Sequence, residues 1–225
     1  MHKTLLKLFL NPATASGGEP RLAEAYAQQW KFLKKVWNEE NYGLERLVRL
    51  FLCAIQFLYP VLLIRDIFGR WGSRGRRLAV EVYAVLKFFF PLAVLFTRGY
   101  QSPAVIFLVV YLMSDTLVHI LHLIFLADVH SAAISYRRSL VLIFLHYAEI
   151  AFGFAVIYRA YDLLSRPVDA IGALYFSIVA TTTVGFGDIT ARDHAGQVVV
   201  MAQLMVCVLF VVIFINYFSQ KLNEK

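Results

Sequence analysis

Residues 181–188 read Thr-Thr-Thr-Val-Gly-Phe-Gly-Asp and lie between two long apolar segments. Glycine occupies the alternating positions Gly185 and Gly187, and glycine adopts the positive φ angles that residues with a Cβ resist. A strand whose backbone alternates in hand can turn successive carbonyl oxygens toward one axis, where they can replace the hydration shell of a cation. The octapeptide therefore predicts a cation-binding loop, and a glycine-rich extracellular turn is the alternative.

The composition indicates a polytopic membrane protein. Of the 225 residues, 60% are hydrophobic, and the formal net charge is +7. Because about 20 apolar residues span the core of a bilayer, the chain has room for four or five spans. The positive charge requires no nucleic-acid partner, since basic residues at span ends orient a membrane protein. Cys53 and Cys207 lie inside apolar segments, which indicates neither a disulfide framework nor a thiolate metal cage.

Four segments are predicted to be membrane-spanning helices, namely Leu78–Phe96, Pro103–Ala127, Leu140–Tyr158 and Ala195–Phe218. A fifth apolar segment, Leu47–Ile64, is interrupted by Arg49, Gln56 and Pro60, and basic residues flank both of its ends. We therefore expect a re-entrant or interfacial element there and a cytoplasmic N-terminus. The alternative is a fifth span with the N-terminus outside.

The fold class that follows is an all-α polytopic membrane protein. An amphipathic or interfacial region is expected at residues 1–43, and additional membrane helices with a basic cytoplasmic loop at 65–77 are expected at 44–137. Within the first region, the segment from Arg21 to Trp37 predicts a helix with an aromatic and basic surface. Such a helix suits the membrane interface or a partner subunit, and an ordinary solvated helix fits equally well.

The octapeptide resembles the selectivity filter of tetrameric potassium channels. The resemblance implies a pore module at 138–225, with an outer helix at 138–160, a pore helix at 167–182, a filter at 183–188 and an inner helix at 195–220. It also implies potassium as the permeant ion rather than a cofactor, held at the carbonyls of residues 183–186, with the Thr183 hydroxyl innermost. The implied ion-coordinating residues are Thr183, Val184, Gly185, Phe186 and Gly187.

The filter departs from the commonest pattern of that family at two places. Phe186 stands where a tyrosine is usual, and Tyr175 and Phe176 stand where the pore helix usually carries paired tryptophans. Because both partners of one familiar hydrogen bond are replaced by apolar rings, the two changes are mutually consistent. We therefore expect altered filter inactivation and unaltered selectivity. The expected filter supports are Thr182, Tyr175, Phe176 and Asp188, with the Tyr175 hydroxyl within reach of Asp188.

The predicted inner helix also departs from the family. Cys207 aligns with the usual glycine hinge, and no glycine follows Gly196 in this segment, so a sharp bend at glycine is not expected. A ring of apolar side chains could close such a pore by dewetting. The candidates for lining the cavity and the gate are Val208, Val211, Ile215 and Asn216.

The charged residues in the other predicted spans bear on gating. None of these spans carries a basic residue at every third position, so we expect no strong voltage gating. Asp115, His119 and His122 share one helix face, and His146 and Glu149 form an i, i+3 pair. Since histidine titrates near neutral pH, proton sensing by His119, His122, His146 and Glu149 is one hypothesis. The alternative is that these groups pair with one another, or with Lys87 and Arg137, in a structural role.

The resemblance therefore implies a potassium-selective channel subunit that is not an enzyme. It would assemble as a homotetramer in the plasma membrane, with its C-terminus in the cytoplasm. One alternative is a non-conducting or regulatory channel subunit with an unknown cytoplasmic or auxiliary partner. Another is a metal-dependent intramembrane enzyme that uses Asp115, His119 and His122 as ligands.

Overall fold

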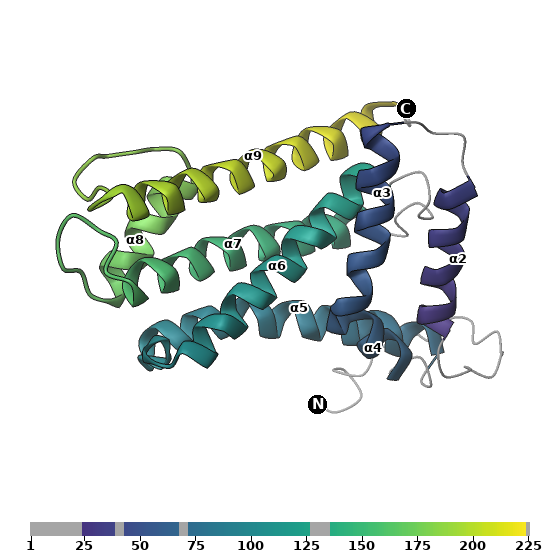
Figure 1. The fold of residues 1–225 in the computed structure, drawn as a ribbon, viewed down its shortest axis with the longest axis horizontal. Helices are drawn as coiled ribbons and strands as arrows, with labels where there is room; N and C mark the ends of the chain where they lie inside the picture. Colours follow the sequence, from purple (N-terminus) through teal and green to yellow (C-terminus); the bar gives the residue numbers. More distant parts are fainter. Residues whose placement is uncertain (1–23, 39–42, 68–71, 127–135, 224–225) are drawn as a thin grey trace. The chain divides into compact units, whose positions relative to one another are not determined.

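The computed structural model describes residues 24–38, 43–67, 72–126 and 136–223, and the regular elements within these ranges are helices (Figure 1). The α-helices are α2 (Glu24–Asn38), α3 (Leu44–Ile55), α4 (Pro60–Ile67), α5 (Gly72–Phe96), α6 (Pro103–Phe125), α7 (Tyr136–Ala160), α8 (Ala170–Thr181) and α9 (His194–Asn223). Two short 3-10 helices, η1 (Gln56–Leu58) and η3 (Gly99–Gln101), precede α4 and α6.

Four of the described helices are long and apolar enough to cross a membrane, at Leu78–Phe96, Pro103–Phe125, Arg138–Ala160 and His194–Ile215. They coincide with the four predicted spans. The predicted fold class, an all-α polytopic membrane protein, is confirmed.

The fifth apolar segment forms no continuous helix. Helix α3 ends at Ile55, η1 follows, and α4 begins at Pro60. Tyr59 has an extended backbone, with φ −99° and ψ 147°, because the residue before a proline is driven out of the helical region. Neither piece is long enough to span a bilayer. The interfacial placement and the side of the N-terminus stay predictions.

The basic segment predicted as a loop at 65–77 is largely helical where it is described. Arg65 lies within α4, and Arg74, Arg76 and Arg77 lie within the first turns of α5. The expected loop is therefore wrong at both of its ends, and residues 68–71 lie outside the described part of the chain.

Packing divides the chain into two compact units, residues 1–83 and 84–225, with the boundary inside α5. This grouping differs from the divisions after residues 43 and 137 that the sequence suggested. Helix α6 packs against both α7 and α9, so it shares a core with the helices that carry the octapeptide.

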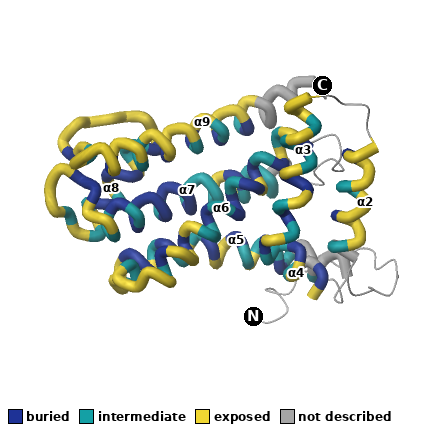
Figure 2. The backbone as a smooth tube through the Cα atoms, viewed as in Figure 1, coloured by how far each residue is buried: buried dark blue, intermediate teal, exposed yellow. Residues whose placement is uncertain are grey.

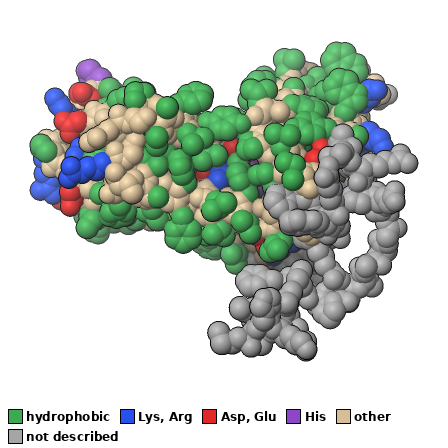
Figure 3. Space-filling view, turned by 90° about the horizontal axis from the view of Figure 1, so that it is seen from below, with side chains coloured by type: hydrophobic (Ala, Val, Ile, Leu, Met, Phe, Trp, Pro, Cys, Tyr) green, Lys and Arg blue, Asp and Glu red, His purple; other side chains and the backbone are tan. Residues whose placement is uncertain are grey.

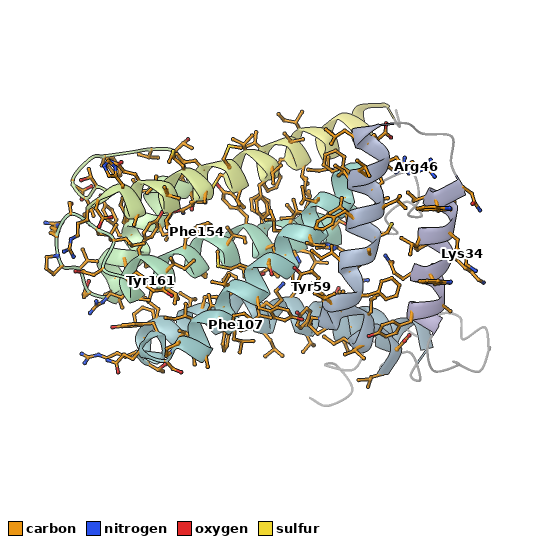
Figure 4. All side chains as sticks on the ribbon, viewed as in Figure 1. Lys34, Arg46, Tyr59, Phe107, Phe154 and Tyr161 are labelled. Atoms are coloured by element: carbon orange, nitrogen blue, oxygen red, sulfur yellow. The ribbon has the colours of Figure 1, made fainter. Side chains whose placement is uncertain are left out.

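In the first unit, α2 packs against α3 and α4. The amide of Gln29 donates to the carbonyl of Cys53 at 3.0 Å inside this packing. The exposed side of α2 carries aromatic and basic side chains, as predicted for this helix. Lys34 lies over the ring of Trp30 at 5.9 Å, and Arg46 of α3 lies over the ring of Trp37 at 5.3 Å (Figure 4).

In the second unit, α7 packs against α6, α8 and α9 (Figure 1). Figure 2 shows α7 largely buried, whereas the outer side of α9 is exposed. Phe154 of α7 lies in the core, and Phe107 of α6 points outward (Figure 4). Gly153 lets α6 and α7 approach closely, because a Cβ at this position would collide with the side chain of Met113.

The surface of the second unit separates into an apolar side and a charged end. In Figure 3 hydrophobic side chains cover the length of the helices, while acidic and basic side chains gather at the end that carries the loops around α8. Exposed residues there include Asp162, Arg166, Arg192 and Asp193. This distribution fits helices whose sides face lipid and whose ends face water.

Candidate functional site

The candidate site begins with α8, a short apolar helix between α7 and α9. Asp169 caps its first turn, because its carboxylate accepts a hydrogen bond from the Gly172 N–H at 2.8 Å. The helix therefore begins at Ala170, later than the start at Pro167 expected from the sequence. Its last helical residue is Thr181, and Thr182 is the C-cap.

The octapeptide leaves α8 through a hydrogen-bonded turn. The Thr183 N–H donates to the Ala180 carbonyl at 3.0 Å, and the Val184 N–H donates to the Val179 carbonyl at 3.2 Å. This pair of bonds is a Schellman motif, in which the residue after the C-cap is left-handed. Thr183 has that conformation, with φ 58°. A β-branched residue is rarely found there, and such strain commonly marks functional sites.

Beyond Thr183 the backbone alternates in hand. Gly185 and Gly187 have φ angles of 60° and 79°, whereas Val184 and Phe186 keep negative φ. All residues from 182 to 188 are exposed in the single chain (Figure 2). The geometry is the alternating strand that the spacing of the glycines predicts, and it can direct successive carbonyl oxygens to one side.

Aromatic side chains hold the outer end of this strand. The ring of Tyr175 is parallel to that of Phe186, with centroids 6.5 Å apart. Desolvation and the nearby Asp188 carboxylate raise the pKa of the Tyr175 hydroxyl. The support of Asp188 by the Tyr175 hydroxyl stays a prediction. Phe176 instead packs edge-on against Tyr158 with centroids 4.9 Å apart, so the ring beside Phe186 within one chain is Tyr175.

The two ends of the loop are tied together outside the strand. Leu164 and Ala191 form an isolated antiparallel bridge, and the Ser165 N–H donates to the Thr190 carbonyl at 2.8 Å. Arg192 forms an exposed ion pair with Asp162 at 2.8 Å. These contacts fix where the chain enters and leaves the loop.

Helix α9 begins at His194, capped by Asp193, whose carboxylate accepts from the Gly196 N–H at 2.9 Å. It extends to Asn223, beyond the expected boundary at residue 220. The gate candidates Val208, Val211 and Ile215 are exposed, and their spacing places them on one face of the helix. The side chain of Asn216, the fourth candidate, lies outside the described part of the structure.

A buried hydrogen-bond network between α7, α8 and α9 was not predicted from the sequence. It joins Tyr158 of α7, Ser177 and Thr181 of α8, and Gln203 of α9. Tyr147 of α7 adds a bond from its hydroxyl to the Thr181 carbonyl at 2.7 Å. The available signal was Gln203, a lone amide within an apolar span, and intramembrane polar residues usually pair across helices.

A second buried cluster joins α5, α6 and α7. The Lys87 ammonium is 2.9 Å from Asp115 and 3.5 Å from Glu149, and the Thr116 hydroxyl bonds to Glu149 at 2.9 Å. His146 Nδ1 lies 3.0 Å from the same carboxylate.

Asp115 and Glu149 therefore pair with Lys87. This pairing is the structural role that the sequence analysis gave as the alternative to proton sensing. The ring of His119 lies 5.6 Å from that of His146, and His122 is buried on α6. The side chain of Arg137 is not described. Among the described residues, no three His, Cys, Asp or Glu side chains gather into a metal site.

Two candidate spans, α7 and α9, enclose the short helix α8 and the loop whose backbone alternates in hand. Residues 141–224, from α7 to α9, match the ion channel family. This part of the chain is therefore similar to an ion channel domain, within a chain that has four helices long and apolar enough to cross a membrane. No curated protein and no solved structure matches the chain.

Proposed function

We propose that the protein is a potassium-selective channel subunit that conducts passively as a homotetramer. The observation that carries this proposal is the alternating hand of the backbone at Thr183, Gly185 and Gly187. Carbonyl oxygens set by such a strand can replace the water around a dehydrated cation without any charged side chain. The sequence resemblance of the octapeptide to potassium filters supports potassium as the ion.

The exposure pattern supports assembly around the filter. Val184 and Phe186 are exposed in one chain, and so are Val208, Val211 and Ile215 on α9. A single loop supplies only part of a coordination shell, so a closed ring of copies is needed to surround an ion. Four copies would place four strands around one axis, and lipid or neighbouring copies would cover the apolar faces.

The charge arrangement supports a channel that is not strongly voltage-gated. Voltage sensing requires net charge to move through the membrane field. Lys87, the one basic residue within the Leu78–Phe96 span, is held between Asp115 and Glu149. The ammonium is offset by two buried carboxylates, so Lys87 is a poor candidate for a mobile positive gating charge. The proposed location is the plasma membrane with a cytoplasmic C-terminus, since this orientation places the basic segments at 65–77 and 137–138 inside.

Purified protein in liposomes tests this proposal. We expect potassium efflux that exceeds sodium efflux and a particle mass corresponding to four 25.7 kDa chains. A monomeric or dimeric particle would contradict the ring. A tetramer without flux under any condition would favour the alternative of a non-conducting or regulatory subunit.

We predict that Phe186→Tyr changes filter inactivation and leaves selectivity intact. The ion ligands at this position are backbone atoms, whereas the side chain packs parallel to Tyr175. A new hydroxyl on the ring that packs against Tyr175 alters the support of the filter rather than its ligands. Single-channel recording should show a changed inactivation rate and a preserved potassium preference. Loss of that preference with unchanged open-state stability would contradict the prediction.

Proton-sensitive gating is a second proposal, carried by the contact between His146 and Glu149. The groups near this pair are Lys87 of α5, which contacts Glu149 and Asp115, and His119 of α6, whose ring lies beside that of His146. Protonation of His146 would add a positive charge beside the Glu149 carboxylate. We expect wild-type open probability to change with pH, and His146→Gln, His119→Gln and His122→Gln to flatten that change. Curves identical to wild type in all three variants would remove the proposal.

A further inference from the structure

Gln203 is the polar exception in the middle of α9. Between Val198 and Ile215 it is the only residue with an amide, hydroxyl or charged side chain, and it is 0% exposed. Where no water is available, an unpaired amide is costly. Its position is therefore defined by its partners.

Both ends of the Gln203 amide are paired with other helices. The oxygen accepts from the Tyr158 hydroxyl of α7 at 2.6 Å. The nitrogen donates toward the Ser177 carbonyl at 3.0 Å, the Ser177 hydroxyl at 3.0 Å and the Thr181 hydroxyl at 2.6 Å, all in α8. A primary amide has two N–H donors, so these three acceptors share them.

The two hydroxyls in α8 are held in a fixed direction. Thr181 donates to the Ser177 carbonyl at 2.7 Å, and Ser177 donates to the Ala151 carbonyl of α7 at 2.6 Å. Each hydroxyl has thereby used its single hydrogen and offers only lone pairs to Gln203. The network therefore requires a hydrogen-bond donor at position 203 of α9. A side chain that has only acceptors would face the Ser177 carbonyl without a hydrogen bond.

The network lies next to the start of the filter strand. Thr181 is the last helical residue of α8, and its carbonyl also accepts from Tyr147. Thr183, where the left-handed turn begins, follows after one residue. A displacement of α9 that carried Gln203 away would release the last turn of α8 and shift the strand that starts there.

We infer that Gln203 is a positioning residue that couples the inner helix α9 to the filter through Ser177 and Thr181. This inference rests on the proposed function, because it assigns a role toward the potassium filter. Gln203 does not touch the ion path. It sets the position of the pore-helix end from which the filter strand extends.

Reversal potentials of the reconstituted protein, with potassium on one side and sodium on the other, test the inference. Gln203→Met retains a long unbranched side chain and removes both polar ends, so we expect the potassium-to-sodium permeability ratio to fall by about tenfold. Tyr158→Phe removes the bond of Gln203 to α7 and leaves the bonds to α8. We expect its ratio to fall less than that of Gln203→Met, because the contact with the end of α8 is retained.

Gln203→Glu separates positioning from packing. A neutral carboxylic acid keeps one donor of the two that the amide has, together with an acceptor oxygen, whereas a carboxylate offers no donor. Selectivity should therefore approach that of wild type at acidic pH and fall as pH rises and the acid loses its proton. The wild-type ratio should not vary in this way.

The outcomes separate the inference from the proposed function. A potassium current with an unchanged ratio in Gln203→Met would overturn the inference and leave the proposed function intact. If Gln203→Met fails to assemble, the pH series of Gln203→Glu decides, and a flat ratio equal to wild type overturns the inference. A wild-type protein without potassium preference would overturn the proposed function itself.

Discussion

Gly185→Ala abolishes potassium-selective flux, and this is the largest functional effect that we expect from a single substitution. Gly185 has φ 60°, and a Cβ built there has no atom within 4 Å in the chain. The effect therefore arises from backbone conformation rather than from a collision within the subunit. For residues with a Cβ the left-handed conformation costs roughly 1–2 kcal/mol, and in the proposed ring the substitution would apply this cost in every copy. Flux from liposomes measures the result.

Gly43→Ala is the matched control. Gly43 also has positive φ, at 73°, and also has open space around a built Cβ, but it lies before α3 in the first unit. Both substitutions place an alanine at a positive φ, at different places in the chain. We expect Gly43→Ala to retain selective flux. Equal flux in Gly185→Ala and wild type would contradict the assignment of the filter.

Lys87→Met destabilises the second unit by about 3–5 kcal/mol, the cost typical of removing one partner from a buried ion pair. Lys87 is 2% exposed, and Asp115 and Glu149 are buried beside it at 2.9 and 3.5 Å. Without the ammonium, the Asp115 and Glu149 carboxylates would lie near each other in an apolar helix bundle with no positive charge between them. Denaturation in detergent micelles, followed by circular dichroism, would show the lowered free energy of unfolding.

An exposed ion pair supplies the comparison for Lys87. Arg192 and Asp162 are 2.8 Å apart and more than half exposed, and such pairs contribute about 0–1 kcal/mol. Arg192→Gln should therefore leave the unfolding free energy nearly unchanged. The triple variant Lys87→Met, Asp115→Leu, Glu149→Met removes all three charges and should recover most of the loss. If Lys87→Met were no less stable than Arg192→Gln, the cluster would not stabilise the fold.

The parts of the fold that the sequence predicted well are those with local signals. The four spans follow from long apolar runs, and the conformation of the strand follows from glycines at alternating positions. The start of α8 was predicted too early, at Pro167, because proline is common in the first turn of helices. The Asp169 cap, two residues later, determines the start instead. The dense charge of Arg74, Arg76 and Arg77 suggests a loop, but these residues lie in α5. Arginine is a good helix former, so its charge does not exclude a helix.

The contacts that were not predicted depend on how helices pack. Ser177 and Thr181 read as ordinary pore-helix residues, and Tyr158 as the end of a span. Only the packing of α7, α8 and α9 brings them to Gln203. The sequence offered both Lys87 and Arg137 as partners of the ionisable residues in α6 and α7. Helical periodicity cannot choose between these two. Sequence spacing gives the face of a helix, whereas the identity of the opposing helix is a tertiary property.

The reversal potential of wild-type protein in a planar bilayer tests the central claim most directly. With potassium on one side and sodium at equal concentration on the other, only selectivity can generate a voltage. The proposed filter predicts a reversal potential far from zero, in the direction of the potassium equilibrium potential. A measurable current that reverses at zero would contradict potassium selectivity.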